Sequence, residues 1–539
     1  MAKGYRPVDR DQPFLFPPDM REWLGPDHPV WLVIRAVEHM DTSAFHAGRK
    51  TGGAGTAGYD PDMLATVLVW AYAHKVTSSR RMEELCRTDV AFRVICAGNL
   101  PDHCTFARFR GDFPAAAGAF FTEVLVLCAR LGMGRLGTIA LDGMKIAADA
   151  SKAANRTEEG LRKLAREAVA AHAAADAAED ELFGAGRRGD EVPERAWSPR
   201  RRDERIRAAL AGLEAERAAA QAAEEARAQE YRARYEAGER AGCPPASAAV
   251  ELAEENLARV RAARAAQLAR LEERYAAGQP RRGRPAGVDD YCRVQEAAAK
   301  VAAARVRAAA AERRTANRAG PGPVRNITDP DSRLMPVHGG GFGQCYNTEN
   351  VVSEDKLVIA TELTDDPTDM AWFEPMTRAA QDAAALIGAH RPAPDPGRGG
   401  HAGAAGGSGI GQELADSGYC SEANLTCPGP DRLIAVGKRR DLEKAARGQD
   451  GGPECGGPAT MAMRERLATD DGITAYRQRG HIAETPHGHI KHNLGIRQLS
   501  LRGKPQASAE WDFICAAHNL LKALTAGHLT TAALAGLPR

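Results

Sequence analysis

The chain has 539 residues, and at about 150 residues per domain this length predicts two to four structural units. It carries 72 lysines and arginines against 71 acids, a net charge of +1, which argues against a uniformly basic surface. Apolar residues make up 44% and charged residues 27%, as in globular proteins. Because aromatic residues reach only 5%, part of the chain is expected to lack a conventional core.

Cysteine usage and hydropathy indicate the compartment. Eleven cysteines are scattered without C-x-x-C pairs, which fits free thiols in a reducing environment better than a disulfide scaffold. The N-terminus lacks the apolar core of a secretion signal, and the longest apolar runs fall well short of the ~20 residues that span a bilayer. We therefore expect a soluble cytoplasmic protein with no membrane partner.

Residues 1–129 follow helical patterns. Asp60 is placed to cap a helix whose first position is Pro61, and further helices are predicted at 79–87 and after Pro101. Arginines on the later helices favour a DNA-binding domain that resembles a helix-turn-helix. An ordinary helical bundle with solvated arginines is the alternative.

The composition changes twice in the middle of the chain. Residues 138–141 predict a short buried strand that ends at Asp142, where a carboxylate is costly unless it has a function. From 156 to 319, alanine, arginine and glutamate predict long helical arms with breaks near Gly242 and Gly278. These arms are either a helical domain for dimerisation or DNA contact, or a solvated insertion.

Residues 320–539 combine strands and helices, which together with residues 130–155 predict an α/β domain split by the insertion. The segment 406–415, just before Asp416, is rich in glycine and predicts only a weak strand. The other predicted elements are a hairpin of strands 343–352 and 357–363, a helix at 372–388, a strand at 433–436, a helical region at 483–526, and Gly-rich loops near 390–412 and 448–458.

Three carboxylates stand out as candidate metal ligands: Asp142, Asp416 and Glu484. Because Pro486 is a good first-turn residue, Glu484 is expected near a helix N-terminus, where the helix dipole favours its ionised form. Acids from three distant segments can hold two hard cations about 3.5–4 Å apart, which act on a phosphodiester. Taken singly, each acid is better explained as a cap or turn residue.

The surroundings of Glu484 strengthen the catalytic interpretation. Six cations and this one acid lie between Tyr476 and Lys504, a local excess hidden by the near-neutral total. On one continuous helix Lys491 would share a face with Glu484, as a site for a phosphate backbone requires; a solvated basic helix is the alternative. The histidines of this stretch lack cysteines or acids at zinc-ligand spacing.

These residues carry a resemblance to a known family. The chain resembles a bacterial insertion-sequence transposase of the DDE type, in the branch numbered eleven-eighty-two, over most of its length outside the insertion and the Gly-rich loops. The motifs are Tyr59–Pro61 through Ser78–Glu84 with Pro101–Arg110, Ile139–Ser151, Thr328–Met335, Ala415–Tyr419, and Glu484–Asn493 with Leu501–Gly503 and His518–Lys522.

The resemblance implies a fold, an activity and roles for these residues. The split α/β domain would be ribonuclease-H-like, a mixed sheet flanked by helices, and would cleave transposon ends and transfer the strands into target DNA. Asp142, Asp416 and Glu484 would be catalytic and hold two Mg²⁺ ions, or Mn²⁺ in their place. The DNA-binding residues would be Lys491, which would contact a phosphate near the transposon end, together with Arg479, Tyr476, Arg497, Arg502 and Arg108.

The resemblance also implies partners. Transposon terminal repeats and target DNA are expected, with a homodimer that pairs the two ends and a location at the nucleoid. Two other functions would share part of this pattern: a metal-dependent nuclease without strand transfer, and a catalytically decayed DNA-binding or scaffold protein.

Overall fold

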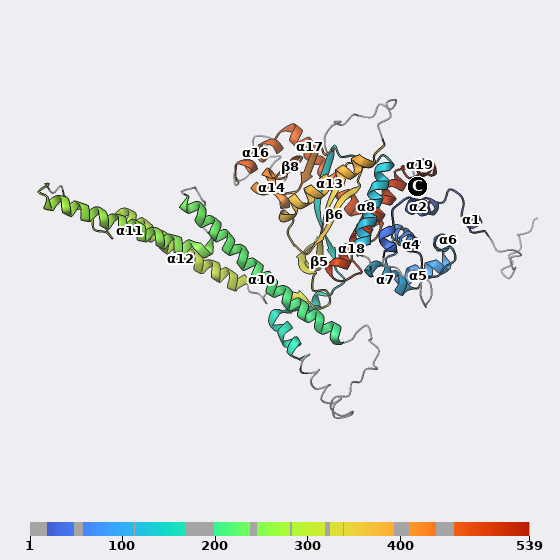
Figure 1. The fold of residues 1–539 in the computed structure, drawn as a ribbon, viewed down its shortest axis with the longest axis horizontal. Coiled ribbons are helices and arrows are strands. Elements are labelled where there is room, and N and C mark those ends of the chain that lie inside the picture. Colours follow the sequence, from blue (N-terminus) through green and yellow to red (C-terminus); the bar gives the residue numbers. More distant parts are fainter. Residues whose placement is uncertain are drawn as a thin grey trace, which may run out of the picture. The chain divides into compact units, whose positions relative to one another are not determined.

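Two compact units make up the chain: unit 1 is Met1–Ala154 with Thr328–Arg539, and unit 2 is Asn155–Ile327. Unit 2 contains the long helices drawn in green and yellow-green in Figure 1. The computed structural model describes residues 19–47, 58–112, 114–167, 170, 199–237, 245–280, 283–318, 324–337, 339–392, 409–437 and 457–537.

Unit 1 begins with a group of helices. The start predicted at Asp60 is confirmed, because its side chain accepts a hydrogen bond from the backbone N–H of Asp62 at 2.8 Å, and the helix predicted at 79–87 is also confirmed. The helices are α1 Met20–Trp23, α2 Pro29–Glu38, α3 Ser43–His46, α4 Pro61–Ala73, α5 Ser79–Thr88, α6 Val90–Ile95, α7 His103–Asp112 and α8 Pro114–Arg130.

A mixed sheet of six strands forms the centre of unit 1. In order they are β4-β5-β1-β7-β8, with β6 also paired to β5. The pairs of β5 with β1, β4 and β6 are antiparallel, whereas β1–β7 and β7–β8 are parallel. The bounds are β1 Thr138–Ala147, β4 Arg333–Pro336, β5 Phe342–Ser353, β6 Val358–Thr364, β7 Gln412–Ala415 and β8 Asp431–Ile434.

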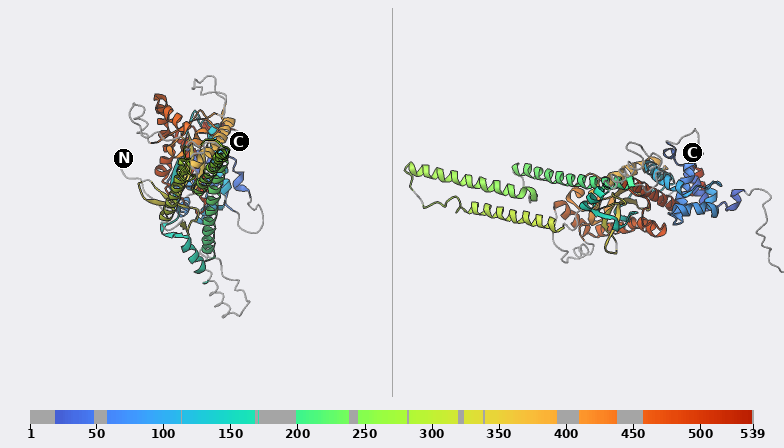
Figure 2. Two further views of the ribbon diagram at one scale, coloured as in Figure 1. Left: turned by 90° about the vertical axis from the view of Figure 1, so that its left-hand side faces the viewer. Right: turned by 90° about the horizontal axis from the view of Figure 1, so that it is seen from below.

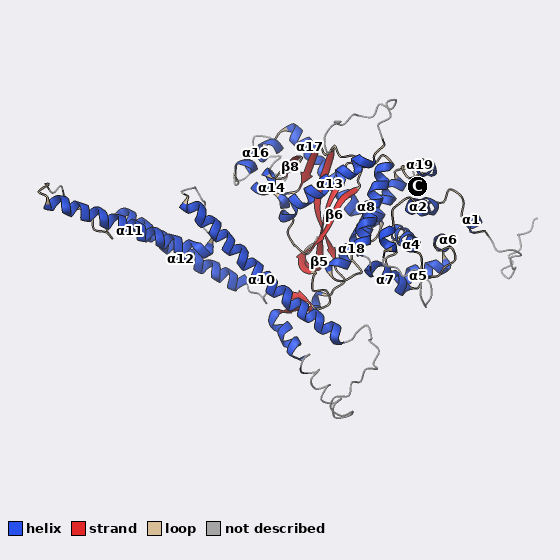
Figure 3. Cartoon of the chain, viewed as in Figure 1, coloured by secondary structure: helices blue, strands red, loops and turns tan. Residues whose placement is uncertain are grey.

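Helices cover both faces of this sheet (Figure 3). One face carries the larger apolar core, which also contains residues of the N-terminal helices; Phe120 of α8 stacks on Phe513 of α18 with ring centroids 4.8 Å apart. The second face packs Ala140 and Leu414 against Ile482. The remaining elements are η1 Lys152–Ala154, η2 Met370–Trp372, α13 Phe373–His390, η3 Ser417–Tyr419, α14 Glu422–Thr426, α16 Pro458–Leu467, α17 Asp470–Gly488, the π-helix η4 His489–Asn493, α18 Lys504–Thr525 and α19 Thr531–Ala535.

The predicted hairpin and helix are confirmed as β5–β6 and α13. The single helical region predicted over 483–526 is wrong, because α17 ends at Gly488 and the chain passes through η4 and a non-helical stretch before α18. Gly495 and Gly503 in that stretch have φ of 70° and 82°, a backbone conformation that breaks a helix. Most of the two predicted Gly-rich loops, at 393–408 and 438–456, lies outside the described residues.

Unit 2 is dominated by three long helices: α10 Pro199–Glu236, α11 Ala246–Ala276 and α12 Cys292–Arg318. They confirm the long helical arms predicted from composition. Helices α11 and α12 run side by side (Figures 1 and 2). The two chain ends of the unit are joined by a short antiparallel pair of strands, β2 Asn155–Thr157 and β3 Val324–Asn326.

The helices in the described part of the chain were compared with the length and hydropathy of a membrane span. No single helix there has both the length and the apolar character needed to cross a bilayer, and one bent pair, His103–Gly111 with Ala116–Arg130, passes that test only in combination.

Candidate active site

Asp142 lies on the central strand of the sheet. The prediction that the strand ends at this acid is wrong, because β1 continues to Ala147. It continues because β5 pairs with it along the whole length, with Asn350 directly opposite Asp142. The acid instead marks the end of the pairing between β1 and β7, whose last matched residues are Leu141 and Ala415.

Asp416 follows β7 immediately. Because β1 and β7 are parallel and Leu141 is level with Ala415, the next residue on each strand is an aspartate. Asp416 is the N-cap of η3, and its Oδ1 accepts a hydrogen bond from the backbone N–H of Gly418 at 2.8 Å. The weak strand expected here forms over four residues, of which 413–415 are buried between β1 and β8.

Glu484 comes from α17, which packs on β1 and β7. The expectation that it lies at a helix N-terminus is wrong. The helix begins at Asp470 behind the N-cap Thr469, and Glu484 falls in its last turns, with Pro486 inside the helix. The favourable dipole of a helix N-terminus is therefore absent at Glu484.

Asp142 lies within electrostatic range of the other two acids. Burial raises the pKa of Asp142 to about 6, Arg479 lowers it, and the negative charges of Asp416 and Glu484 raise it further. Asp416 at the end of β7 and Glu484 on α17 therefore both act on the Asp142 carboxylate. A crowded set of carboxylate oxygens is a donor set that suits hard divalent cations.

Arg479 and Tyr476 hold the site from α17. The Arg479 guanidinium lies 3.2 Å from Oδ1 of Asp142, and the Tyr476 hydroxyl donates to the carbonyl of Ala415 at 3.2 Å. Arg479 is the cation nearest to the acids among the ion pairs of the described residues. Arg479 thus compensates part of the acid charge, and Tyr476 fixes the end of β7.

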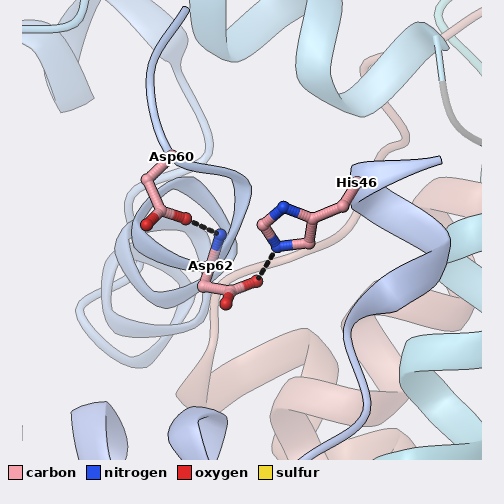
Figure 4. A group of neighbouring side chains, drawn as sticks. All are labelled: His46, Asp60 and Asp62. Carbon is pink, nitrogen blue, oxygen red and sulfur yellow. Dashed lines mark hydrogen bonds and ion pairs between the residues drawn. The ribbon is translucent and has the colours of Figure 1, made fainter. Parts of the chain in front are cut away.

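A different group of side chains has its possible metal-ligand atoms close together. Among the described residues, only His46, Asp60 and Asp62 have ligand atoms that all lie within 4.8 Å of one another (Figure 4), so the three proposed catalytic acids do not meet that criterion. Local contacts explain the exposed group, because Asp60 caps α4 and His46 pairs with Asp62 at 3.1 Å.

The basic residues predicted to bind DNA do not all lie beside the three candidate acids. Lys491 is half-buried and donates from Nζ to the carbonyl of Lys145 at 3.1 Å. The continuous α-helix assumed for its predicted face is interrupted, because the π-helix η4 begins at His489, between Glu484 and Lys491. Arg497 is exposed beside Lys491, and Arg502 pairs with Asp149 at 2.8 Å.

Arg108 is the most separate of the predicted DNA-binding residues. It is exposed on α7. Among the described residues, no hydrogen bond or ion pair joins it to Asp142, Asp416 or Glu484. The site is therefore assembled from β1, β7 and α17, while Arg108 belongs to the N-terminal helices.

Two buried polar residues near Asp142, His487 and Glu349, were not selected as site residues from the sequence. His487 is 9% exposed and lies 3.6 Å from Oδ2 of Asp142; burial lowers its pKa to about 3. Glu349 is fully buried and accepts from the hydroxyl of Tyr419. The only sequence signal for His487 was its place in a histidine-rich run, and a strand glutamate such as Glu349 carries none.

Comparison with known families gives two matches. Residues 18–112 match the family model of a transposase domain (DUF772), and residues 456–524 match that of a transposase DDE domain. No curated protein and no solved structure matches the chain. Glu484 and Lys491 lie inside the second match, whereas Asp142 and Asp416 lie outside both.

The two matches support a DDE-type transposase, a nucleic-acid-processing enzyme whose partner is DNA. Enzymes of this class generally use divalent metal ions. The carboxylate oxygens around Asp142 fit such ions, since the charges of Asp416 and Glu484 raise the pKa of Asp142 and a cation would relieve that repulsion.

Proposed function

We propose that this protein is a transposase that cleaves the ends of its element and joins them to target DNA. The observation that carries the proposal is that Asp142 and Asp416 directly follow the paired residues Leu141 and Ala415 of β1 and β7, beside Arg479 of α17, the helix that also carries Glu484. The mixed sheet flanked by helices supports a ribonuclease-H-like fold, and the ordered motifs support membership of the branch numbered eleven-eighty-two.

In this proposal Asp142, Asp416 and Glu484 would hold two Mg²⁺ ions, or Mn²⁺ in their place, which would supply an activated water or hydroxyl and stabilisation of the leaving oxygen of a phosphodiester. Arg479 orients Asp142 and offsets part of the acid charge, and Tyr476 anchors the strand that presents Asp416. Lys491, Arg497, Arg502 and Arg108 bind the phosphate backbone, and paired ends imply a homodimer at the nucleoid.

The domain limits form part of the same proposal. Residues 1–129 would bind DNA, residues 130–155 and 320–539 would form the catalytic domain, and the 156–319 insertion would support assembly of the dimer. The composition of unit 1, Met1–Ala154 with Thr328–Arg539, supports a catalytic domain split by an insertion, with residues 155 and 320–327 in unit 2.

Strand transfer separates this proposal from a simple nuclease. The assay supplies labelled DNA ends that already carry a free 3′-hydroxyl, together with a supercoiled target and Mg²⁺. Wild type should join the ends to the target, and Asp416→Asn should not. Cleavage of uncut ends without joining would identify a nuclease, and DNA binding without either reaction would identify a decayed protein.

A further inference from the structure

A chain of buried polar side chains leads from the far face of the sheet to Asp142. The Trp511 indole donates from Nε1 to Oγ1 of Thr361 at 2.7 Å, and Thr361 donates to Oδ1 of Asn350 at 2.7 Å. Nδ2 of Asn350 lies 3.2 Å from Nε2 of His487, and Nδ1 of His487 lies 3.6 Å from Oδ2 of Asp142. The chain crosses from α18 through β6 and β5 to α17.

The groups on both sides of Asn350 together fix the direction of the hydrogen bonds in this chain. An indole N–H can only donate, so Oγ1 of Thr361 accepts from Trp511 and sends its own proton to Asn350. On the other side of the amide, Nδ2 of Asn350 faces the carbonyl of Thr348 at 3.5 Å and Oγ1 of Thr348 at 3.0 Å. That hydroxyl donates to the carbonyl of Met144 at 3.1 Å, so both of its neighbours require Nδ2, not the amide oxygen, at this position.

The orientation of the Asn350 side-chain amide determines which ring nitrogen of His487 carries the proton. Because a donor faces Nε2 of His487, Nε2 has to accept and carries no proton. The ring is then neutral, and its single proton lies on Nδ1. Nδ1 is the atom that faces Oδ2 of Asp142, whereas the Arg479 guanidinium lies 3.2 Å from Oδ1.

We propose that His487 is a positioning residue that presents its Nδ1–H to Asp142 and holds that carboxylate in the orientation that ion binding needs. The inference deepens the proposed function and rests on it for the catalytic role of Asp142. Partners that orient a metal-binding side chain are as consequential as the ligands themselves, because they fix its geometry. The 3.6 Å separation is a contact rather than a full hydrogen bond, and such contacts often tighten only in the loaded complex.

A second buried histidine provides a matched comparison. His518 contacts His489 through Nδ1 at 2.9 Å and the carbonyl of Lys356 through Nε2 at 3.0 Å. A backbone carbonyl can only accept, so His518 carries its proton on Nε2. The two buried histidines are therefore expected in opposite tautomers, for reasons that do not depend on catalysis.

Nitrogen NMR of the full chain, labelled with ¹⁵N-histidine, tests the tautomers directly. We expect Nδ1 protonated in His487 and Nε2 protonated in His518, each assigned by the loss of its signals in His487→Asn and His518→Gln. In Asn350→Leu nothing donates to Nε2, so the second tautomer of His487 should appear. A proton on Nε2 of His487 in the wild type would overturn the inference.

Cleavage kinetics test whether the contact positions Asp142. The amide nitrogen of His487→Asn occupies the place of Nδ1, whereas that of His487→Gln reaches the place of Nε2. We expect the Gln variant to lose about 10–100-fold in kcat with unchanged DNA affinity, the Asn variant to keep most of its activity, and His518→Gln to resemble wild type. Equal losses in both His487 variants at equal thermal stability would refute positioning.

The two experiments also separate this inference from the proposed function. A wild type that cleaves no element-end DNA with any divalent ion contradicts the proposed function. In that case the tautomer of His487 still tests whether its Nδ1–H faces Asp142. A cleaving wild type whose His487 carries its proton on Nε2 leaves the function standing and overturns the inference.

Discussion

Substitution of the buried Glu349 by glutamine should make the protein less sensitive to rising pH. Glu349 is 0% exposed, and burial raises its pKa to about 8 from the reference value of 4.5; nearby Asp369 raises it too, while the Tyr419 hydroxyl and Lys145 lower it. The folded protein therefore keeps this proton at neutral pH, whereas the unfolded chain releases it.

The sign and size of the effect follow from this difference in pKa. Between pH 4.5 and 8 the folded state binds one more proton than the unfolded state, so stability falls as pH rises, by about 1.4 kcal/mol per pH unit. From pH 5 to pH 8 the carboxyl of Glu349 thus removes stability on the order of 4 kcal/mol. A glutamine in its place has the same shape and no proton to lose.

Denaturant midpoints of wild type and Glu349→Gln should be measured from pH 5 to pH 8. The variant should gain on wild type steadily across this range, and the difference between the two curves removes contributions from other buried acids such as Glu413, whose pKa burial raises to about 7. The exposed Glu465→Gln on α16 is the control and should follow wild type. Parallel curves for wild type and Glu349→Gln would refute the reasoning.

Three further outcomes are expected. Because Arg479 lowers the pKa of Asp142, Arg479→Gln should raise that pKa above about 6 and shift the acid limb of the cleavage rate at limiting Mg²⁺ to higher pH; an unchanged limb would count against the pair. A Cβ on Gly143 would lie 2.8 Å from a carboxylate oxygen of Asp369, so Gly143→Ala should lower the free energy of unfolding by about 1–3 kcal/mol. Gly388 on α13 has open space around it, so Gly388→Ala should raise the free energy of unfolding by about 0.5–1 kcal/mol. Denaturant midpoints equal to that of wild type would contradict both predictions. Arg497→Ala should reduce the salt slope of DNA binding by about 1, and an unchanged slope would remove this residue from the interface.

A helix start that depends on neighbouring residues alone could be predicted from the sequence. Asp60 followed by Pro61 is a cap and a first helical position, and both act as such in α4. No helix start was predicted at Thr469, the N-cap of α17. Pro486 predicted a first-turn position, but it lies inside α17 near the C-terminus of that helix, next to a π-helix.

The other errors come from partners far away in the chain. Nothing near Asp142 shows that β1 continues past it, because the strand that pairs with it is formed by 342–353, about two hundred residues later. The chain from Trp511 to His487 likewise needs side chains from four elements. The candidate acids could be selected by motif, but the contacts that orient them depend on the tertiary fold.

The most direct test of the account is Mg²⁺-dependent cleavage of labelled element-end DNA by single variants of the three acids. Asp142→Asn, Asp416→Asn and Glu484→Gln should each lower the cleavage rate by on the order of 100-fold or more at every Mg²⁺ concentration, with DNA binding retained and Glu465→Gln active as wild type. Cleavage by Asp142→Asn at the wild-type rate would remove the central acid from the site and contradict the proposed mechanism.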